Sequence, residues 1–81
     1  MDKYEVVAYE KDGGIYDTIF KTPSKALAER VAVCIQKLIN RGGYVRHDNG
    51  EPYDWTMIYD ADGTRVYSES LQKVYDGGCA V

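Results

Sequence analysis

The sequence predicts an α+β domain, a two-layer sandwich in which one amphipathic helix covers one face of an antiparallel sheet of four or five strands, in the chain order ββαβββ. Segments rich in β-branched and aromatic residues alternate with turn signals on both sides of a single long helical pattern. The chain has 81 residues, which is too short for two independent cores. We therefore expect a single domain over residues 1–75 and a flexible tail over 76–81.

The N-terminal half predicts a β-hairpin followed by a helix. Residues 3–10 and 15–20 have strand composition and are separated by a turn with two glycines. Thr22 is the expected helix N-cap, Pro23 the first helical residue, and Gly42-Gly43 the helix end. The apolar stripe that we expect to face the sheet consists of Leu27, Ala28, Val31, Ala32, Cys34, Ile35, Leu38 and Ile39.

The C-terminal half predicts a three-stranded meander. We expect strands at Tyr44–His47, Tyr53–Tyr59 and Thr64–Glu69, separated by turns at Asp48-Asn49-Gly50 and Asp60–Gly63. A short helical turn should follow, containing Leu71, Val74 and Tyr75. Alternation along the middle strand defines one set of large side chains that we expect to face the helix: Tyr53, Trp55, Met57 and Tyr59.

The predicted hairpin carries apolar side chains on both sides, and a single helix cannot cover two faces. We therefore expect an exposed apolar patch on the second face of the sheet, drawn from Val7, Tyr9, Tyr16, Phe20 and Ile58. The alternative is that the C-terminal segment folds back over that face. The eight tyrosines fit an interaction surface and ordinary strand positions equally well.

Charge is divided along the chain, although the net charge is only −3. Between residues 21 and 46 there are six basic residues and one acidic residue, and between 47 and 63 there are five acidic residues and no Lys or Arg. An acidic, tyrosine-rich surface could dock on a basic partner; the alternative is ordinary turn chemistry. The candidate partner-binding residues are Asp48, Glu51, Asp54, Asp60, Asp62, Tyr9, Tyr16 and Tyr67.

Catalytic, metal and cofactor chemistry is not predicted. The one histidine, His47, has no recognisable nucleophile or base arranged around it, so we expect no enzyme. Asp60–Gly63 does not have the spacing of a calcium loop, and the glycine pairs do not form a phosphate loop. The spacing of Cys34 and Cys79 argues against a zinc site and a disulfide. We expect no cofactor and no bound metal.

No segment has the length or apolarity of a membrane span, and the first residues lack the apolar core of a signal peptide. We therefore expect no membrane partner and a cytoplasmic location, which would be the host cytoplasm for a phage-encoded protein.

The segment Phe20–Val31, a strand running into a helix rich in alanine, resembles the strand-to-helix step of the arm-type DNA-binding domains of phage integrases and of some phage-encoded inhibitors of bacterial RNA polymerase. The resemblance covers about a dozen residues. It does not identify a family, because any joint between a hairpin and a helix needs a capping residue such as Thr22. The chain also departs from the integrase pattern, with two expected strands before the helix and three after it.

Three functional hypotheses follow. The first is a small non-enzymatic module that binds a protein or ribonucleoprotein and occludes it, similar in style to phage or mobile-element inhibitors such as the anti-CRISPR proteins. The second is a nucleic-acid-binding domain that uses Arg46 and Arg65 on the sheet, or the basic helix face of Lys25, Arg30, Lys37 and Arg41. It ranks second because the sequence pI is about 5.0. The third is a homodimeric structural or adaptor protein.

Overall fold

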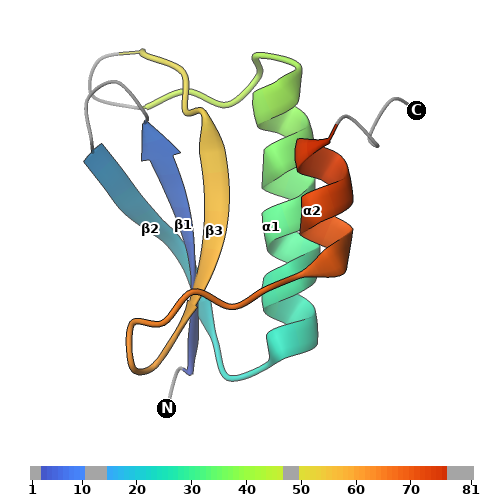
Figure 1. Ribbon diagram of the computed structural model, residues 1–81. Coiled ribbons are helices and arrows are strands. Elements are labelled where there is room, and N and C mark those ends of the chain that lie inside the picture. The colour runs from blue at the N-terminus through green and yellow to red at the C-terminus, as the bar shows by residue number, and fades with distance from the viewer. Residues whose placement is uncertain (1–2, 11–14, 47–49, 77–81) are drawn as a thin grey trace.

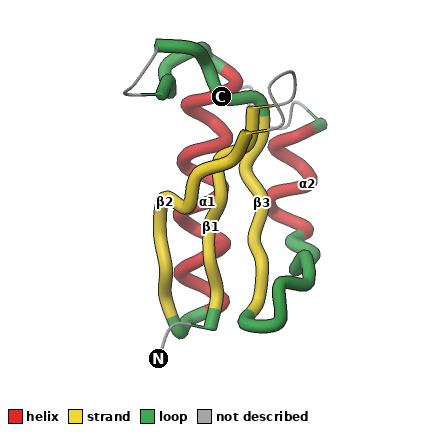
Figure 2. The backbone as a smooth tube through the Cα atoms, turned by 90° about the vertical axis from the view of Figure 1, so that its left-hand side faces the viewer, coloured by secondary structure: helices red, strands yellow, loops and turns green. Residues whose placement is uncertain are grey.

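Within the residues that the structure describes, the protein folds as three strands and two helices (Figure 1). The computed structural model describes residues 3–10, 15–46 and 50–76. In chain order the elements are β1 (Tyr4–Glu10), β2 (Ile15–Thr22), α1 (Lys25–Asn40), β3 (Trp55–Asp60) and α2 (Glu69–Tyr75). The antiparallel sheet has the order β2-β1-β3. Figure 2 looks onto the face of the sheet turned away from α1, which lies behind the strands, while α2 lies beyond the edge of β3.

The predicted α+β class and first hairpin are confirmed, but the prediction of four or five strands and one helix is wrong for the described residues. In the expected strand at residues 44–47, Val45 makes a single bridge to Pro52. In the expected strand at residues 64–69, pairing is limited to a bridge between Arg65 and Tyr59. The chain then turns into α2, because the Ser68 hydroxyl accepts a hydrogen bond from the Leu71 N–H at 3.2 Å and caps the helix. The turn at 11–14 lies outside the described residues.

Helix α1 begins two residues later than predicted and ends as predicted. Thr22 stays in β2, paired with Tyr4, so Ser24 caps the helix through a hydrogen bond from the Leu27 N–H at 3.1 Å. At the other end Gly42 has a φ of 73°, and the Gly43 N–H bonds to the Leu38 carbonyl at 2.8 Å. This left-handed glycine satisfies the last carbonyls of the helix.

The face that α1 turns to the sheet is narrower than the predicted stripe. Its buried residues are Ala28, Ala32 and Gln36, whereas Leu27 is 39% exposed and Cys34 is exposed. The prediction was therefore wrong for those two residues. Two small alanines at the contact allow the helix axis to approach the strands closely. The core cluster consists of Val6, Ala28, Ala32, Ile58 and Leu71.

Strand β3 turns the opposite side to the helices from the one predicted. Thr56 and Ile58 are fully buried on the helix side. The Gln36 side-chain oxygen accepts hydrogen bonds from the Thr56 N–H at 2.6 Å and from its hydroxyl at 2.8 Å. Because side chains alternate along a strand, Trp55, Met57 and Tyr59 face the other way, so the prediction is wrong for these three; Tyr53, which precedes β3, is buried as predicted. A threonine is tolerated at this core position because Gln36 accepts the hydrogen bond of its buried hydroxyl.

The C-terminal helix covers α1 and leaves the second face of the sheet uncovered. Leu71 and Val74 are buried, and Leu71 belongs to the cluster that contains Ala28 and Ala32. At its far end α2 reaches β3, where the Tyr75 hydroxyl donates to the Thr56 carbonyl. The alternative in which this segment folds over the second face is therefore wrong.

Candidate functional site

The candidate site is the face of the sheet turned away from the helices, which we call the open face. Its side chains alternate with those of the core, and cross-strand pairing through β1 arranges them in three rows. The rows are Tyr16, Tyr9 and Trp55; then Thr18, Val7 and Met57; then Lys21, Glu5 and Tyr59. The structure thus places six large apolar or aromatic side chains on one uncovered surface.

The exposure of these side chains differs across the open face. Tyr16 is 63% exposed, whereas Val7, at the centre, is 4% exposed beneath its neighbours. Tyr9, Trp55, Met57 and Tyr59 are half-buried. The Tyr59 hydroxyl donates to the Met57 sulfur at 3.2 Å. An apolar surface with polar hydroxyl tips is typical of protein interfaces that also face water.

A β-bulge decides which residues of β2 reach the open face. The pairing with β1 shifts between Val6 and Val7, so that Val6 opposes Phe20 and Val7 opposes Thr18, leaving Ile19 as the extra residue. Strict alternation from Tyr16 would have turned Phe20 outward. Instead Phe20 packs against the core, and Ile58 is also buried there. The expected patch is therefore confirmed for Tyr9 and Tyr16 and wrong for Phe20 and Ile58, while Val7 lies on the expected side but is buried.

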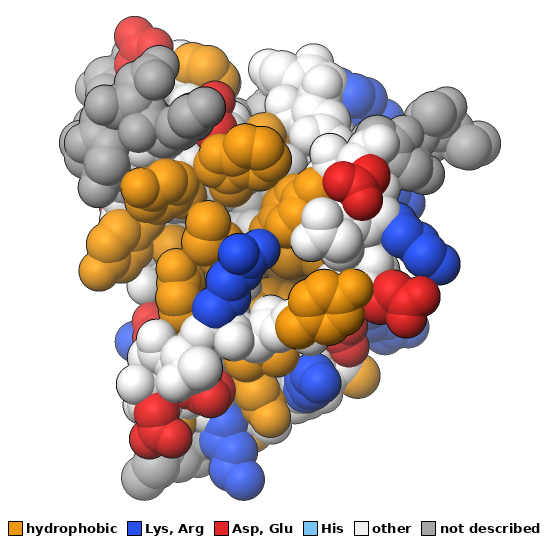
Figure 3. Space-filling view, in the orientation of Figure 1, with side chains coloured by type: hydrophobic (Ala, Val, Ile, Leu, Met, Phe, Trp, Pro, Cys, Tyr) orange, Lys and Arg blue, Asp and Glu red, His pale blue; other side chains and the backbone are white. Residues whose placement is uncertain are grey.

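A hollow of about 400 Å³ lies where the open face meets α2, and we call it the tryptophan hollow. Figure 3 shows hydrophobic side chains gathered on this side of the molecule, with basic side chains among them. Trp55 and Tyr75 meet edge to face, with ring centroids 5.6 Å apart. Burial raises the pKa of Tyr75, and the nearby Arg65 guanidinium opposes that rise. The lining residues are Trp55, Met57, Arg65, Gln72, Tyr75 and Asp76.

A second hollow, of about 260 Å³, lies at the other end of the open face, and we call it the glutamate hollow. Glu5 is half-buried there, and its carboxylate accepts a hydrogen bond from the Thr18 hydroxyl at 3.1 Å. Gly63 has a φ of 79° and closes the turn that borders this hollow. The lining residues are Glu5, Val7, Tyr16, Thr18, Tyr59 and Gly63. A carboxylate set among apolar groups favours a cationic or hydroxyl donor.

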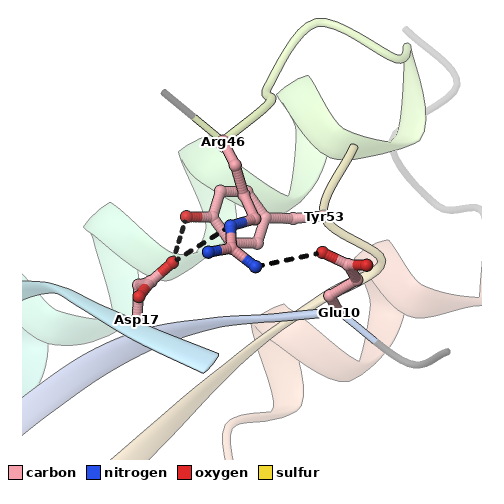
Figure 4. Close-up of polar contacts among 4 residues, drawn as sticks. All are labelled: Glu10, Asp17, Arg46 and Tyr53. Atoms are coloured by element: carbon pink, nitrogen blue, oxygen red, sulfur yellow. Dashed lines mark hydrogen bonds and ion pairs between the residues drawn. The ribbon is translucent and has the colours of Figure 1, made fainter. Parts of the chain in front are cut away.

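On the helix side, beyond the end of α1, a polar cluster fixes the loop between α1 and β3 to the sheet (Figure 4). The Arg46 guanidinium lies 3.5 Å from a Glu10 carboxylate oxygen and 3.8 Å from an Asp17 oxygen. The Tyr53 hydroxyl donates to that Asp17 oxygen at 2.7 Å. Burial, followed by this hydrogen bond and the negative charge of Asp17, raises the pKa of Tyr53 to about 12. The cluster holds the start of β3 in register and is therefore part of the scaffold.

The acidic candidates occupy separate parts of the structure. Asp54 is half-buried, and its N–H bonds to the Tyr9 carbonyl at 2.9 Å. Asp60 uses its carboxylate to cap its own turn, accepting the N–H groups of Asp62 at 2.9 Å and Thr64 at 3.0 Å. Glu51 and Asp62 are exposed, and Asp48 lies outside the described residues. Asp54 precedes β3 and Asp60 ends it, about 20 Å apart, so no compact acidic strip includes both.

The basic candidates and Tyr67 lie away from the two hollows, with one exception. Lys25, Arg30 and Lys37 are exposed on α1, and Arg41 is exposed at its C-cap. At about 100° per residue, Arg30, Lys37 and Arg41 share one stripe and Lys25 does not. Arg46 belongs to the polar cluster, and Tyr67 is 69% exposed. Arg65 is the exception, because it lines the tryptophan hollow.

A third hollow, of about 460 Å³, lies between the two helices and is lined by Ala26, Glu29, Arg30, Val33, Cys34 and Ser70. The Glu29 carboxylate accepts a hydrogen bond from the Ser68 hydroxyl at 2.6 Å. This contact connects α1 to the N-cap of α2. Among residues 3–10, 15–46 and 50–76, no three His, Cys, Asp or Glu side chains come together as a metal ion would require.

Sequence reasoning found Tyr9 and Tyr16 and missed most of the tryptophan hollow. The sequence places Trp55 and Met57 in the core, and it places Tyr75 in a short helical turn, which α2 confirms, without indicating that this turn meets Trp55. In the part of the chain that the structure describes, no helix is long and apolar enough to cross a membrane. Comparison with protein-family models, curated proteins and solved structures finds no match to this chain. The function is therefore argued from the geometry of these residues.

Proposed function

We propose that this chain is a non-enzymatic protein-binding module whose recognition surface is the open face of the sheet. The observation that carries the proposal is the uncovered surface formed by Tyr16, Tyr9, Trp55 and Met57 in two adjacent rows, while α1 packs on the opposite side of the sheet and α2 packs on α1. Tyrosine, tryptophan and arginine are the residues most enriched among energetic anchors of protein interfaces, and this face combines all three.

The edges of the sheet are less suited to binding than its face. On β3, the Thr56 N–H and carbonyl bond to Gln36 and Tyr75, and the Ile58 carbonyl accepts the Val66 N–H at 2.8 Å. On β2, the bulge and the charged Lys21 are devices that discourage strand addition. A partner therefore has to be recognised through side chains of the open face more than through main-chain pairing.

The charge of the chain favours a protein over nucleic acid. The net charge is −3, and the acidic Glu5 lies on the open face itself. Nucleic-acid binders rely on a basic surface to neutralise phosphates. The occluding, inhibitory role expected from the sequence adds one element to the proposal, namely that the partner loses activity when the open face covers it.

The test compares two exposed tyrosines. Tagged wild-type protein, Tyr16→Ser and Tyr67→Ser would each be used to capture proteins from cells of the source organism and its host, and a captured partner would be purified and its affinity measured. We expect Tyr16→Ser to weaken binding at least tenfold and Tyr67→Ser, which changes an equally exposed tyrosine outside both hollows, to leave it unchanged. Equal losses, recovery of nucleic acid alone, or self-association abolished by Tyr16→Ser would contradict the proposal.

A further inference from the structure

The two hollows of the open face differ in chemistry and lie at a fixed spacing. The tryptophan hollow offers Trp55 and Tyr75 as apolar walls, whereas the glutamate hollow contains the Glu5 carboxylate. Glu5 pairs with Tyr59, which is four residues along β3 from Trp55. Four residues of extended chain span about 13 Å. The open face thus presents an apolar hollow and an anionic hollow about 13 Å apart.

We propose that the partner is recognised through an extended peptide segment with a large apolar or aromatic residue in the tryptophan hollow and a Lys or Arg, four residues away, at Glu5. This inference rests on the proposed function and specifies its partner. A hollow of about 400 Å³ has room for one large side chain, and its aromatic walls are suited to an anchor of that kind.

Charge complementarity predicts the basic residue of the bound peptide. The Thr18 hydroxyl holds the Glu5 carboxylate in place at the foot of the glutamate hollow. The adjacent turn contributes the exposed Asp62 beside Gly63, which adds negative potential at the same end. Lys21 is exposed opposite Glu5 on β2, and Arg65 follows Tyr59 at the far side of the same row, so a cation has to reach the Glu5 carboxylate from above the sheet, between these two basic residues. An acidic residue at this position would be repelled.

The test is selection from a random-peptide display library on immobilised wild-type protein, with Glu5→Gln, Glu5→Lys and the control Glu69→Lys in parallel. Glu69 is an exposed residue of α2 that lines neither open-face hollow and makes a surface ion pair with Lys73 at 3.8 Å. On wild type and on the control we expect an aromatic or large aliphatic residue spaced four from a Lys or Arg, with the basic residue enriched about fivefold. Glu5→Gln, which keeps the shape and an acceptor for Thr18, should abolish the basic preference, and Glu5→Lys should convert it to an acidic one.

The possible failures are distinguishable. Peptides that depend on Tyr16 but lack the spaced basic residue would overturn this inference and leave the proposed function standing. Peptides that bind Tyr16→Ser as well as wild type, or no enrichment on any of the proteins, would overturn both. A switch of charge preference cannot come from misfolding, because an unfolded variant would lose all selection.

Discussion

Replacing Gln36 should destabilise the protein far more than replacing a polar side chain on the surface would. Gln36 is 1% exposed, and its side-chain oxygen accepts both the N–H and the hydroxyl of Thr56. Its amide nitrogen donates to the Asn40 side chain at 3.0 Å and toward the Asp54 carbonyl at 3.5 Å. One side chain therefore joins α1 to the start of β3.

The magnitude follows from the groups left behind. In Gln36→Ala the buried Thr56 N–H loses its acceptor, which costs about 1–3 kcal/mol. The Thr56 hydroxyl can still donate to the Ala32 carbonyl, which lies 3.2 Å away. The vacated volume adds about 1–2 kcal/mol. We expect a total of about 3 kcal/mol, from a global stability of about 4–12 kcal/mol for a chain of this size.

The assay is urea unfolding followed by the fluorescence of Trp55, the single tryptophan. Gln36→Met fills the volume without the acceptor and should still lose about 2 kcal/mol. Hydrogen exchange at the Thr56 amide should accelerate in both variants. Gln72→Met on α2 is the matched control and should change stability by less than about 0.5 kcal/mol. If Gln36→Met were as stable as wild type, the hydrogen-bonding argument would be refuted.

Three further predictions concern single groups. The pKa of Tyr53 is raised to about 12, so its stabilising contribution is complete below pH ~10, where the unfolded phenol is still protonated, and is lost as pH rises from ~10 to ~12. The loss, about 1 kcal/mol after screening by solvent around the exposed Asp17 carboxylate, should be absent in Tyr53→Phe when urea midpoints are compared across that range. Asp60→Ala removes the hydrogen bonds to the Asp62 and Thr64 N–H groups and should cost about 1 kcal/mol in urea unfolding; no change would mean that the carboxylate does not hold the turn. Ser24→Ala should lower the melting temperature by removing an N-cap worth about 1 kcal/mol, and an unaltered melting temperature would exclude Ser24 as the cap.

The sequence predicts elements whose signals are local. Alternation, turn glycines and helical spacing locate the hairpin, the end of α1 at Gly42 and the helical turn that becomes α2. The start of α1 was misplaced because Thr22 and Ser24 are both good caps, and the choice depends on how far β2 pairs with β1. The predicted strands at 44–47 and 64–69 have strand composition but make single bridges in the described residues, because Pro52, opposite Val45, has no N–H to extend the pairing and Ser68 begins α2.

The candidate site was harder to predict, since it depends on which side of each strand meets the helix. Tyr9 and Tyr16 were identified because both sides of the hairpin are apolar. Trp55 and Met57 were assigned to the core, because hydrophobicity alone favours burying the larger set of β3 side chains. The bulge at Ile19, which turns Phe20 inward, has no signature in the sequence that fixes its position.

Gln36 and Thr56 explain why β3 nevertheless keeps its bulkier side outward. A slip of β3 by one residue would exchange its two faces, placing Trp55 and Met57 against α1 and Thr56 on the open face. In the observed register the Thr56 N–H and hydroxyl both donate hydrogen bonds to the Gln36 side chain. The Thr56 carbonyl accepts a hydrogen bond from the Tyr75 hydroxyl. A slipped strand would leave the buried Gln36 amide facing apolar groups, at a cost comparable to that of the Gln36→Met variant. The polar pair inside the core thus holds the aromatic side chains on the surface proposed here to bind a partner.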